Sequence, residues 1–143
     1  MHWTIHIDPN VNCAFVKYYG AFDISQLKNS AEEMFSHPDY RVGMNALRDA
    51  SNQTIPSDVS FKSLSNEARG TMNEFDHKLA KCKWAIVVGN VQSYAKVHQA
   101  LVAGRIGDNP VHRKAFRDIE KAKEWLGIPE GYEIKYLATG ETT

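Results

Sequence analysis

The run WAIVV, Trp84 to Val88, decides the fold because it is apolar at every position. A strand that is apolar on both faces is typical of the centre of a parallel sheet, where helices cover each side. The turn residues Gly89 and Asn90 follow at once, and an apolar pattern with helical spacing then runs from Tyr94 to Val102. The stretch therefore predicts a strand, a tight turn and a helix in direct succession.

The segments on either side of this run repeat the order of strand and helix. Further strands are predicted at 42–47 and 111–116, and amphipathic helices at 24–35, 56–81 and 119–126. Within the longest of these helices, Gly70 predicts a kink or a break, because glycine costs about 1 kcal/mol there relative to alanine. The last alternating segment, 132–137, predicts a small terminal strand.

The N-terminal region predicts a hairpin. Residues 3–7 and 12–19 alternate between apolar and polar side chains, and Asp8-Pro9-Asn10 between them favours a turn. So short a connection permits only antiparallel pairing. We therefore expect an α/β fold with a mixed, mostly parallel five-stranded sheet, an antiparallel N-terminal edge strand and about four helices.

Length and charge limit the class of protein. The chain has 143 residues, which predicts a single domain over 1–143 with a frayed tail at 139–143. Its 17 Lys and Arg residues equal its 17 Asp and Glu residues, which argues against a nucleic-acid or anionic membrane surface. No apolar run is long enough to span a membrane, and the first residues resemble a strand and not a signal peptide. We therefore expect a cytoplasmic protein in which Cys13 and Cys82 are buried, reduced thiols.

The candidate site is the edge of the sheet beyond the carboxyl ends of the parallel strands. Ligands of open α/β sheets bind there, and helix N-termini offer free N–H groups at the same edge. Four loops should gather at this edge, 20–23, 49–57, 89–93 and 117–118. The candidates for contact with a partner or a small anion are Asp49, Ser51, Asn52, Thr54, Ser57, Asn90, Ser93 and Tyr94.

Two serines of this set have alternative interpretations. Ser57 follows Pro56 and is well placed to cap the helix that we expect to begin there. Ser51 and Ser57 are also the candidate phosphoacceptors, since a helix N-terminus stabilises a phosphate. The neighbouring carboxylates of Asp49 and Asp58 would oppose that phosphate.

The sequence predicts no catalytic group, metal ion or cofactor. Three loop carboxylates, Asp23, Asp49 and Asp118, would have to converge to hold Mg²⁺, whereas each is also placed to cap its own turn. The six histidines lack zinc spacing, and neither cysteine has an adjacent histidine that would activate it. An enzyme is therefore the third hypothesis, after the two that follow.

A family resemblance supplies the first hypothesis. The hairpin ending at Gly20, HPDYRVGMNALRDAS (37–51), KWAIVVGNVQSYAKVHQAL (83–101) and FRDIEKAKEWL (116–126) together resemble the SpoIIAA-like branch of the STAS domains. The resemblance covers about Ile5 to Leu126 and implies a STAS-like sandwich. It implies a non-enzymatic regulatory module that binds a protein partner, as anti-sigma-factor antagonists do, and a homodimer is a further expectation. The family's Asp-Ser-Ser-Gly signature, which carries its phospho-switch, is absent, and Asp49-Ala50-Ser51-Asn52 stands in its place.

The second hypothesis is a carrier of a small apolar ligand or lipid. The ligand would lie between the 56–81 helix and the sheet, with Gly70 as the kink of a movable lid. The two hypotheses differ in one visible way, because a carrier needs a cavity under this helix and a regulator is solid there.

Overall fold

The computed structural model describes residues 1–75, 79–103 and 111–136 of the chain. Its five strands are β1 (His2–Asp8), β2 (Cys13–Tyr19), β3 (Asn45–Ala50), β4 (Cys82–Val88) and β5 (Val111–Phe116). They form one sheet in the order β1-β2-β3-β4-β5, with β1 antiparallel to β2 and every later pair parallel. The predicted mixed sheet with an antiparallel N-terminal edge strand is confirmed.

Within the described residues, four α-helices connect or follow the strands. These are α1 (Leu27–Ser36), α2 (Phe61–Phe75), α3 (Val91–Ala103) and α4 (Ile119–Trp125). The short 3₁₀ helix η1 (Pro9–Val11) lies in the hairpin, and a second one, η2 (Ile24–Gln26), leads into α1. The order of elements is therefore the predicted one as far as α4.

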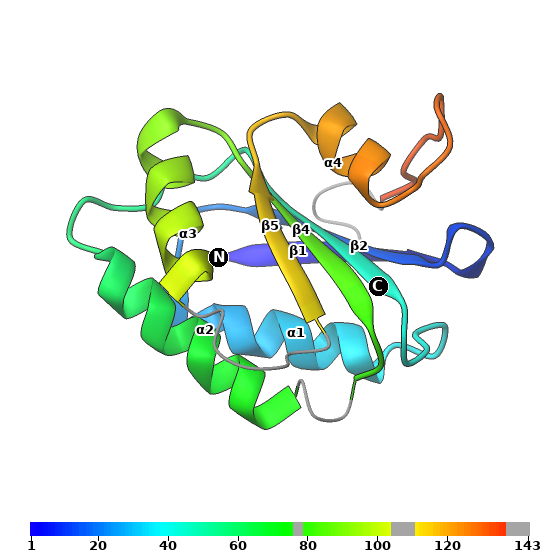
Figure 1. Ribbon diagram of the computed structural model, residues 1–143, viewed down its shortest axis with the longest axis horizontal. Coiled ribbons are helices and arrows are strands. Elements are labelled where there is room, and N and C mark those ends of the chain that lie inside the picture. Colours follow the sequence, from blue (N-terminus) through cyan, green and yellow to red (C-terminus); the bar gives the residue numbers. More distant parts are fainter. Residues whose placement is uncertain (76–78, 104–110, 137–143) are drawn as a thin grey trace.

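The helices divide unequally between the two faces of the sheet (Figure 1). Strands that follow one another across a sheet, joined by crossovers of one hand, receive their helices on the same face. On that face Met34 of α1 packs with Val16 and Trp84. On the opposite face Ala122 of α4 packs with Phe15. The helices α1, α2 and α3 thus cover one face, and α4 with the C-terminal segment covers the other.

The sequential strand order also bears on where a ligand can bind. In doubly wound sheets the crevice at the carboxyl edge opens where the strand order reverses. In the sheet that the structure describes, the order does not reverse. The physical reason for expecting a crevice at the loop edge is therefore missing.

Two of the predicted strands differ from the structure. The third strand begins at Asn45 and not at Val42, because the Met44 N–H donates to the Arg41 carbonyl (3.1 Å) and closes a turn. Gly43 has a positive φ of 94° in this turn, and the Val42 side chain is 63% exposed. The segment 132–136 contains no strand, although Tyr132, Ile134 and Tyr136 pack against the α4 face as their alternation predicts. Leu137 and the tail 139–143 lie outside the described residues.

The long helix is shorter than the predicted 56–81 range and does not break at Gly70. Residues 56–59 form a turn in which the Val59 N–H donates to the Pro56 carbonyl (3.0 Å). Helix α2 begins after Ser60, whose Oγ accepts from the Ser63 N–H (3.1 Å). The serine that caps this helix is therefore Ser60 and not Ser57. Leu79 and Ala80 lie outside the helix, and 76–78 are not among the described residues.

Neither cysteine is in a disulfide, as predicted. Cys13 begins β2 and Cys82 begins β4, and β3 lies between these strands. Burial raises the pKa of the Cys13 thiol well above its ordinary value. Cys13 is therefore an apolar core residue and not a nucleophile.

Candidate functional site

All four predicted loops begin at the same edge of the sheet, because β2, β3, β4 and β5 run parallel, and hydrogen bonds join three of these loops. The Gln53 side-chain amide donates to the Gly20 carbonyl (3.0 Å), which joins the second loop to the first. The Ile55 N–H donates to the Ser93 hydroxyl (3.2 Å), which joins the second loop to the third. Asp49 and Asn90 thus lie at the same edge, as the sequence predicts.

Three of the predicted site residues stabilise this edge. Asp49 is buried, and its Oδ1 accepts from both the backbone N–H (3.0 Å) and the hydroxyl (2.6 Å) of Ser51. Asn90 caps α3, because its Oδ1 accepts from the Ser93 N–H (2.8 Å). The Tyr94 ring stacks on His98 with the centroids 5.7 Å apart. Each of these three residues, Asp49, Asn90 and Tyr94, thus makes contacts within its own loop or helix, and these contacts account for its presence without a ligand.

The remaining candidates differ in what they offer. Asn52, Thr54 and Ser57 are exposed at the edge, and Ser57 lies in the turn that precedes α2. Ser51 is also exposed, but its hydroxyl donates to the Asp49 carboxylate. A phosphate on Ser51 would replace that hydrogen bond with a repulsion between two anions.

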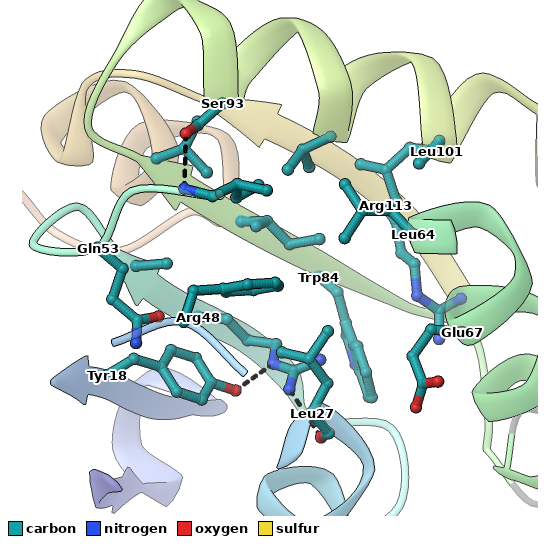
Figure 2. Close-up of a pocket in the computed structure, with 17 residues that line it drawn as sticks. Tyr18, Leu27, Arg48, Gln53, Leu64, Glu67, Trp84, Ser93, Leu101 and Arg113 are labelled. Carbon is teal, nitrogen blue, oxygen red and sulfur yellow. Dashed lines mark hydrogen bonds between the residues drawn. The ribbon is translucent and has the colours of Figure 1, made fainter. Parts of the chain in front are cut away.

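A pocket of about 120 Å³ extends from this edge into the layer between α2, α3 and the sheet. Its lining is mainly apolar and includes Phe22, Leu27, Ile55, Leu64, Ile86, Val88, Val97 and Leu101. Figure 2 shows the side chains that surround it. Of the residues predicted for the site, Ser93 lines this pocket, and the loop residues Gln53 and Ile55 line it as well. The pocket and the loop edge are therefore joined at these three residues.

An arginine of the central strand β3 projects into the pocket (Figure 2). Arg48 pairs with Val16 of β2 and Ile86 of β4, so it stands on the face that α1, α2 and α3 cover. Its Nε donates to the Tyr18 hydroxyl (2.7 Å). Its Nη2 donates to the Ser30 hydroxyl (2.8 Å) and to the Leu27 carbonyl (3.2 Å). All three acceptors are uncharged.

A second arginine, Arg113, contacts the ring of Trp84 at the same pocket. Arg113 of β5 is the register partner of Trp84, and its guanidinium carbon lies 4.7 Å from the centre of the indole ring. The guanidinium carbon of Arg48 lies 6.0 Å from the same ring. Glu67 of α2 also lines the pocket, so the charged lining residues that the structure describes are two arginines and one glutamate. This described part of the lining carries an excess of one positive charge.

The indole of Trp84 is itself an unusual feature of this site. Its side chain is 1% exposed, and its Nε1–H has no acceptor among the residues that the structure describes. Buried donors without a partner are rare in native proteins and call for an explanation. The indole thus forms part of the pocket wall, while its N–H is closed off from the space itself.

Five polar lining residues of the pocket are not among the site residues predicted from the sequence, namely Tyr18, Arg48, Gln53, Glu67 and Arg113. A signal was present in the strand alternation, because Arg48 shares a face with Ala46 and Ala50. A charged residue on the covered face of a central strand is costly, so it marks a position with a special role.

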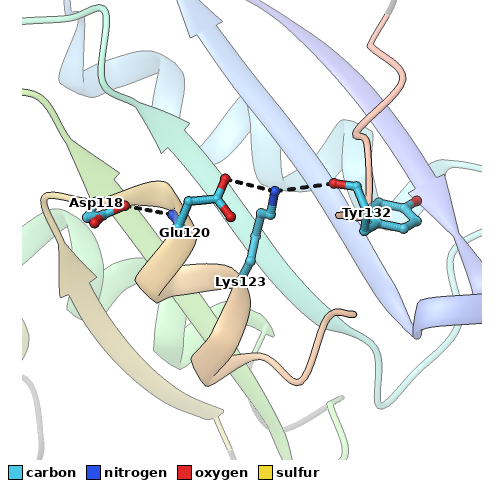
Figure 3. A network of polar contacts seen from close by, with 4 residues as sticks. All are labelled: Asp118, Glu120, Lys123 and Tyr132. Carbon is cyan, nitrogen blue, oxygen red and sulfur yellow. Dashed lines mark hydrogen bonds and ion pairs between the residues drawn. The ribbon is translucent and has the colours of Figure 1, made fainter. Parts of the chain in front are cut away.

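The three loop carboxylates bind their own turns. Asp23 accepts from the Ser25 N–H (3.0 Å), and Asp118 accepts from the Glu120 N–H (2.8 Å) at the start of α4. Figure 3 shows Asp118 at this cap, beside the Lys123 side chain that donates to Glu120 (3.1 Å) and to the Tyr132 carbonyl (3.2 Å). Within the described ranges, no three His, Cys, Asp or Glu residues are placed to hold a metal ion.

Comparisons with known proteins add no information about the function of this site. No family model, no curated protein and no solved structure matches the chain. Among the helices of the described residues, none combines the length and the apolar character needed to cross a membrane.

Proposed function

We propose that this protein binds a small, mainly apolar ligand in the pocket between α2, α3 and the sheet. The single observation that supports the proposal is the cavity of about 120 Å³ in this layer. Protein interiors are close-packed, and voids larger than a water molecule are few. A cavity under α2 is also the feature that separates a ligand carrier from a solid regulatory domain.

The size of the pocket limits the ligand. An engineered apolar cavity of about 150 Å³ binds benzene, so the present pocket accepts a single ring or a short chain. Small residues keep the space open, because Ala50 of β3 and Ala100 of α3 both face it. The ligand we propose therefore has one apolar ring or a chain of similar volume.

The test is a titration of the ¹⁵N-labelled protein with benzyl alcohol, followed by ¹H–¹⁵N NMR. We expect shifts that concentrate at the residues lining the pocket. In Ala100→Phe the new ring occupies the space, and the shifts should disappear. The matched control is Ala95→Phe on the same helix, where the side chain is exposed and lies outside the pocket lining. Binding that Ala100→Phe leaves intact would contradict the proposal, as would shifts away from the pocket.

A protein-binding regulatory module is the second proposal, and the loop edge favours it. Ser51, Asn52, Thr54 and Ser57 present a polar, exposed surface at one edge, and the SpoIIAA-like resemblance implies a protein partner. Its test is affinity purification from the native cell with Asn52→Arg as the comparison, since a bulky cation at the edge should remove a partner that binds there. Mapping of phosphorylated residues in the same sample tests Ser51 and Ser57. A partner that Asn52→Arg still retains would place the contact elsewhere.

A further inference from the structure

We propose that the ligand of this pocket is a small organic carboxylate, whose anionic group binds Arg48 and whose apolar part fills the space beneath α2. The inference rests on the proposed function and adds the chemical class of the ligand.

The first argument is the state of the Arg48 side chain. Three of its hydrogen bonds run to uncharged oxygens, those of Tyr18, Ser30 and Leu27. Its Nη1 donates to no residue that the structure describes, and no carboxylate of those residues forms an ion pair with it. A half-buried cation without a counter-charge is unfavourable. An anion from outside the chain would therefore complete this site.

The second argument is the fixed orientation of the guanidinium. Nε and Nη2 are used to hold the group between Tyr18 and the start of α1, which leaves Nη1 for a ligand. The group also lies over two aromatic rings, with its central carbon 5.5 Å from the ring centre of Tyr18 and 6.0 Å from that of Trp84. A donor that is already held in place loses little freedom when the ligand binds.

The third argument is the balance of charge in the described lining, where the guanidinium groups of Arg48 and Arg113 both lie over the Trp84 ring. Glu67 is the one acidic residue of the described lining, and Figure 2 shows it at the Arg113 end of the pocket. A carboxylate beside Arg48 would balance the remaining positive charge.

The experiment compares benzoate with benzyl alcohol, which have the same ring and differ in charge. NMR titration of the unaltered protein at low ionic strength should give a dissociation constant for benzoate that is at least about tenfold lower. In Arg48→Met the side chain keeps its length without the charge. There we expect benzoate to lose about tenfold in affinity and benzyl alcohol to bind within about twofold of its original affinity. Arg117→Met, an exposed position outside the pocket, is the matched control and should change neither ligand.

The possible results separate this inference from the proposed function. If benzyl alcohol binds in the pocket and benzoate binds no tighter, the proposal of a carboxylate ligand is wrong, whereas the proposal of a ligand pocket is supported. If Arg48→Met lowers the affinity for both ligands equally, Arg48 has a structural role, and the proposal of a carboxylate ligand is again wrong. If neither ligand binds in the pocket, the proposed function fails and the inference fails with it. The comparison of the two ligands uses the unaltered chain, so it decides the question even if Arg48→Met does not fold.

Discussion

Arg48 and Tyr18 are joined across neighbouring strands by a hydrogen bond of 2.7 Å from the Arg48 Nε to the Tyr18 hydroxyl. The same hydroxyl lies 2.8 Å from the Ser30 Oγ, which itself accepts from Arg48. Tyr18 of β2, Ser30 of α1 and Arg48 of β3 are thus all hydrogen-bonded to one another, and the first two hold the Arg48 guanidinium in place. The position of the positive charge in the pocket is set by the fold, before any ligand is present.

Removal of the Tyr18 hydroxyl should destabilise the protein. Tyr18→Phe leaves the Arg48 Nε without its acceptor in a partly buried site, which costs about 1–3 kcal/mol. Urea unfolding followed by circular dichroism measures the loss. The matched control is Tyr19→Phe at the next position, whose ring faces away from this set and whose change should be within about 0.5 kcal/mol. Equal effects of the two substitutions would show that the hydrogen bond to Arg48 contributes nothing special.

A side chain at Gly89 should disrupt the loop edge. A Cβ at this position would lie 2.2 Å from the Ser51 carbonyl oxygen, so backbone must move. Gly89→Ala should therefore cost about 1–3 kcal/mol in unfolding free energy, as other overpacked substitutions do. We also expect faster amide hydrogen exchange at residues 50–55, because this loop is the part displaced. Unchanged exchange there would contradict the close contact.

The substitution Gly70→Ala should stabilise the protein, in contrast to Gly89→Ala. Gly70 is exposed within α2, and a Cβ there would meet nothing within 4 Å. Alanine favours the helical conformation over glycine by about 1 kcal/mol, so the midpoint of thermal unfolding should rise. A fall in the midpoint would indicate that the helix uses the glycine for a bend.

The carboxyl of Asp8 provides a prediction about pH. The Tyr132 hydroxyl donates to its Oδ2 (2.6 Å), and this bond, with the Asn10 N–H, lowers the pKa of Asp8 below its ordinary value. Tyr132→Phe should raise that pKa, which ¹³C NMR of the carboxyl measures. Asp23 is the internal control, because the Ser25 hydroxyl and N–H lower its pKa independently of Tyr132.

The sign of the stability effect follows from the direction of the shift. A carboxyl with a lowered pKa in the folded state adds stability above its unfolded pKa and loses it as the pH falls through the folded value. The difference in unfolding free energy between the wild type and Tyr132→Phe should therefore be largest near neutral pH and shrink below about pH 4. A difference that grows on acidification would contradict the hydrogen bond to the ionised carboxylate.

Hydrophobic periodicity was sufficient to predict the order of the strands and helices. The fully apolar strand at Trp84–Val88 correctly indicated a central position with a covered face on each side. Boundaries were less accurate where a local turn competes with a strand or helix pattern. Val42 and Pro56 lie next to apolar segments, but the turns at 41–44 and 56–59 exclude both residues from the elements that follow.

The second hypothesis from the sequence places a ligand under the long helix, but periodicity could not decide whether a cavity exists there, because that depends on how closely α2 and α3 approach the sheet. The other expected site, a crevice at the loop edge, requires a reversal of strand order that this sheet lacks. Arg48 and Arg113 belong to different strands, and only the register brings both to the ring of Trp84. Their shared position depends on contacts far apart in the chain.

The uneven covering of the two faces has a consequence for synthesis on the ribosome. All helices that cover the pocket face have been synthesised once β5 has left the ribosome, since α1, α2 and α3 precede β5 in the chain. The other face carries Phe15, Leu47 and Val87, and its cover comes from Ala122, Leu126 and the residues up to Tyr136. During translation these apolar side chains therefore stay uncovered until residues 119–136 have been made.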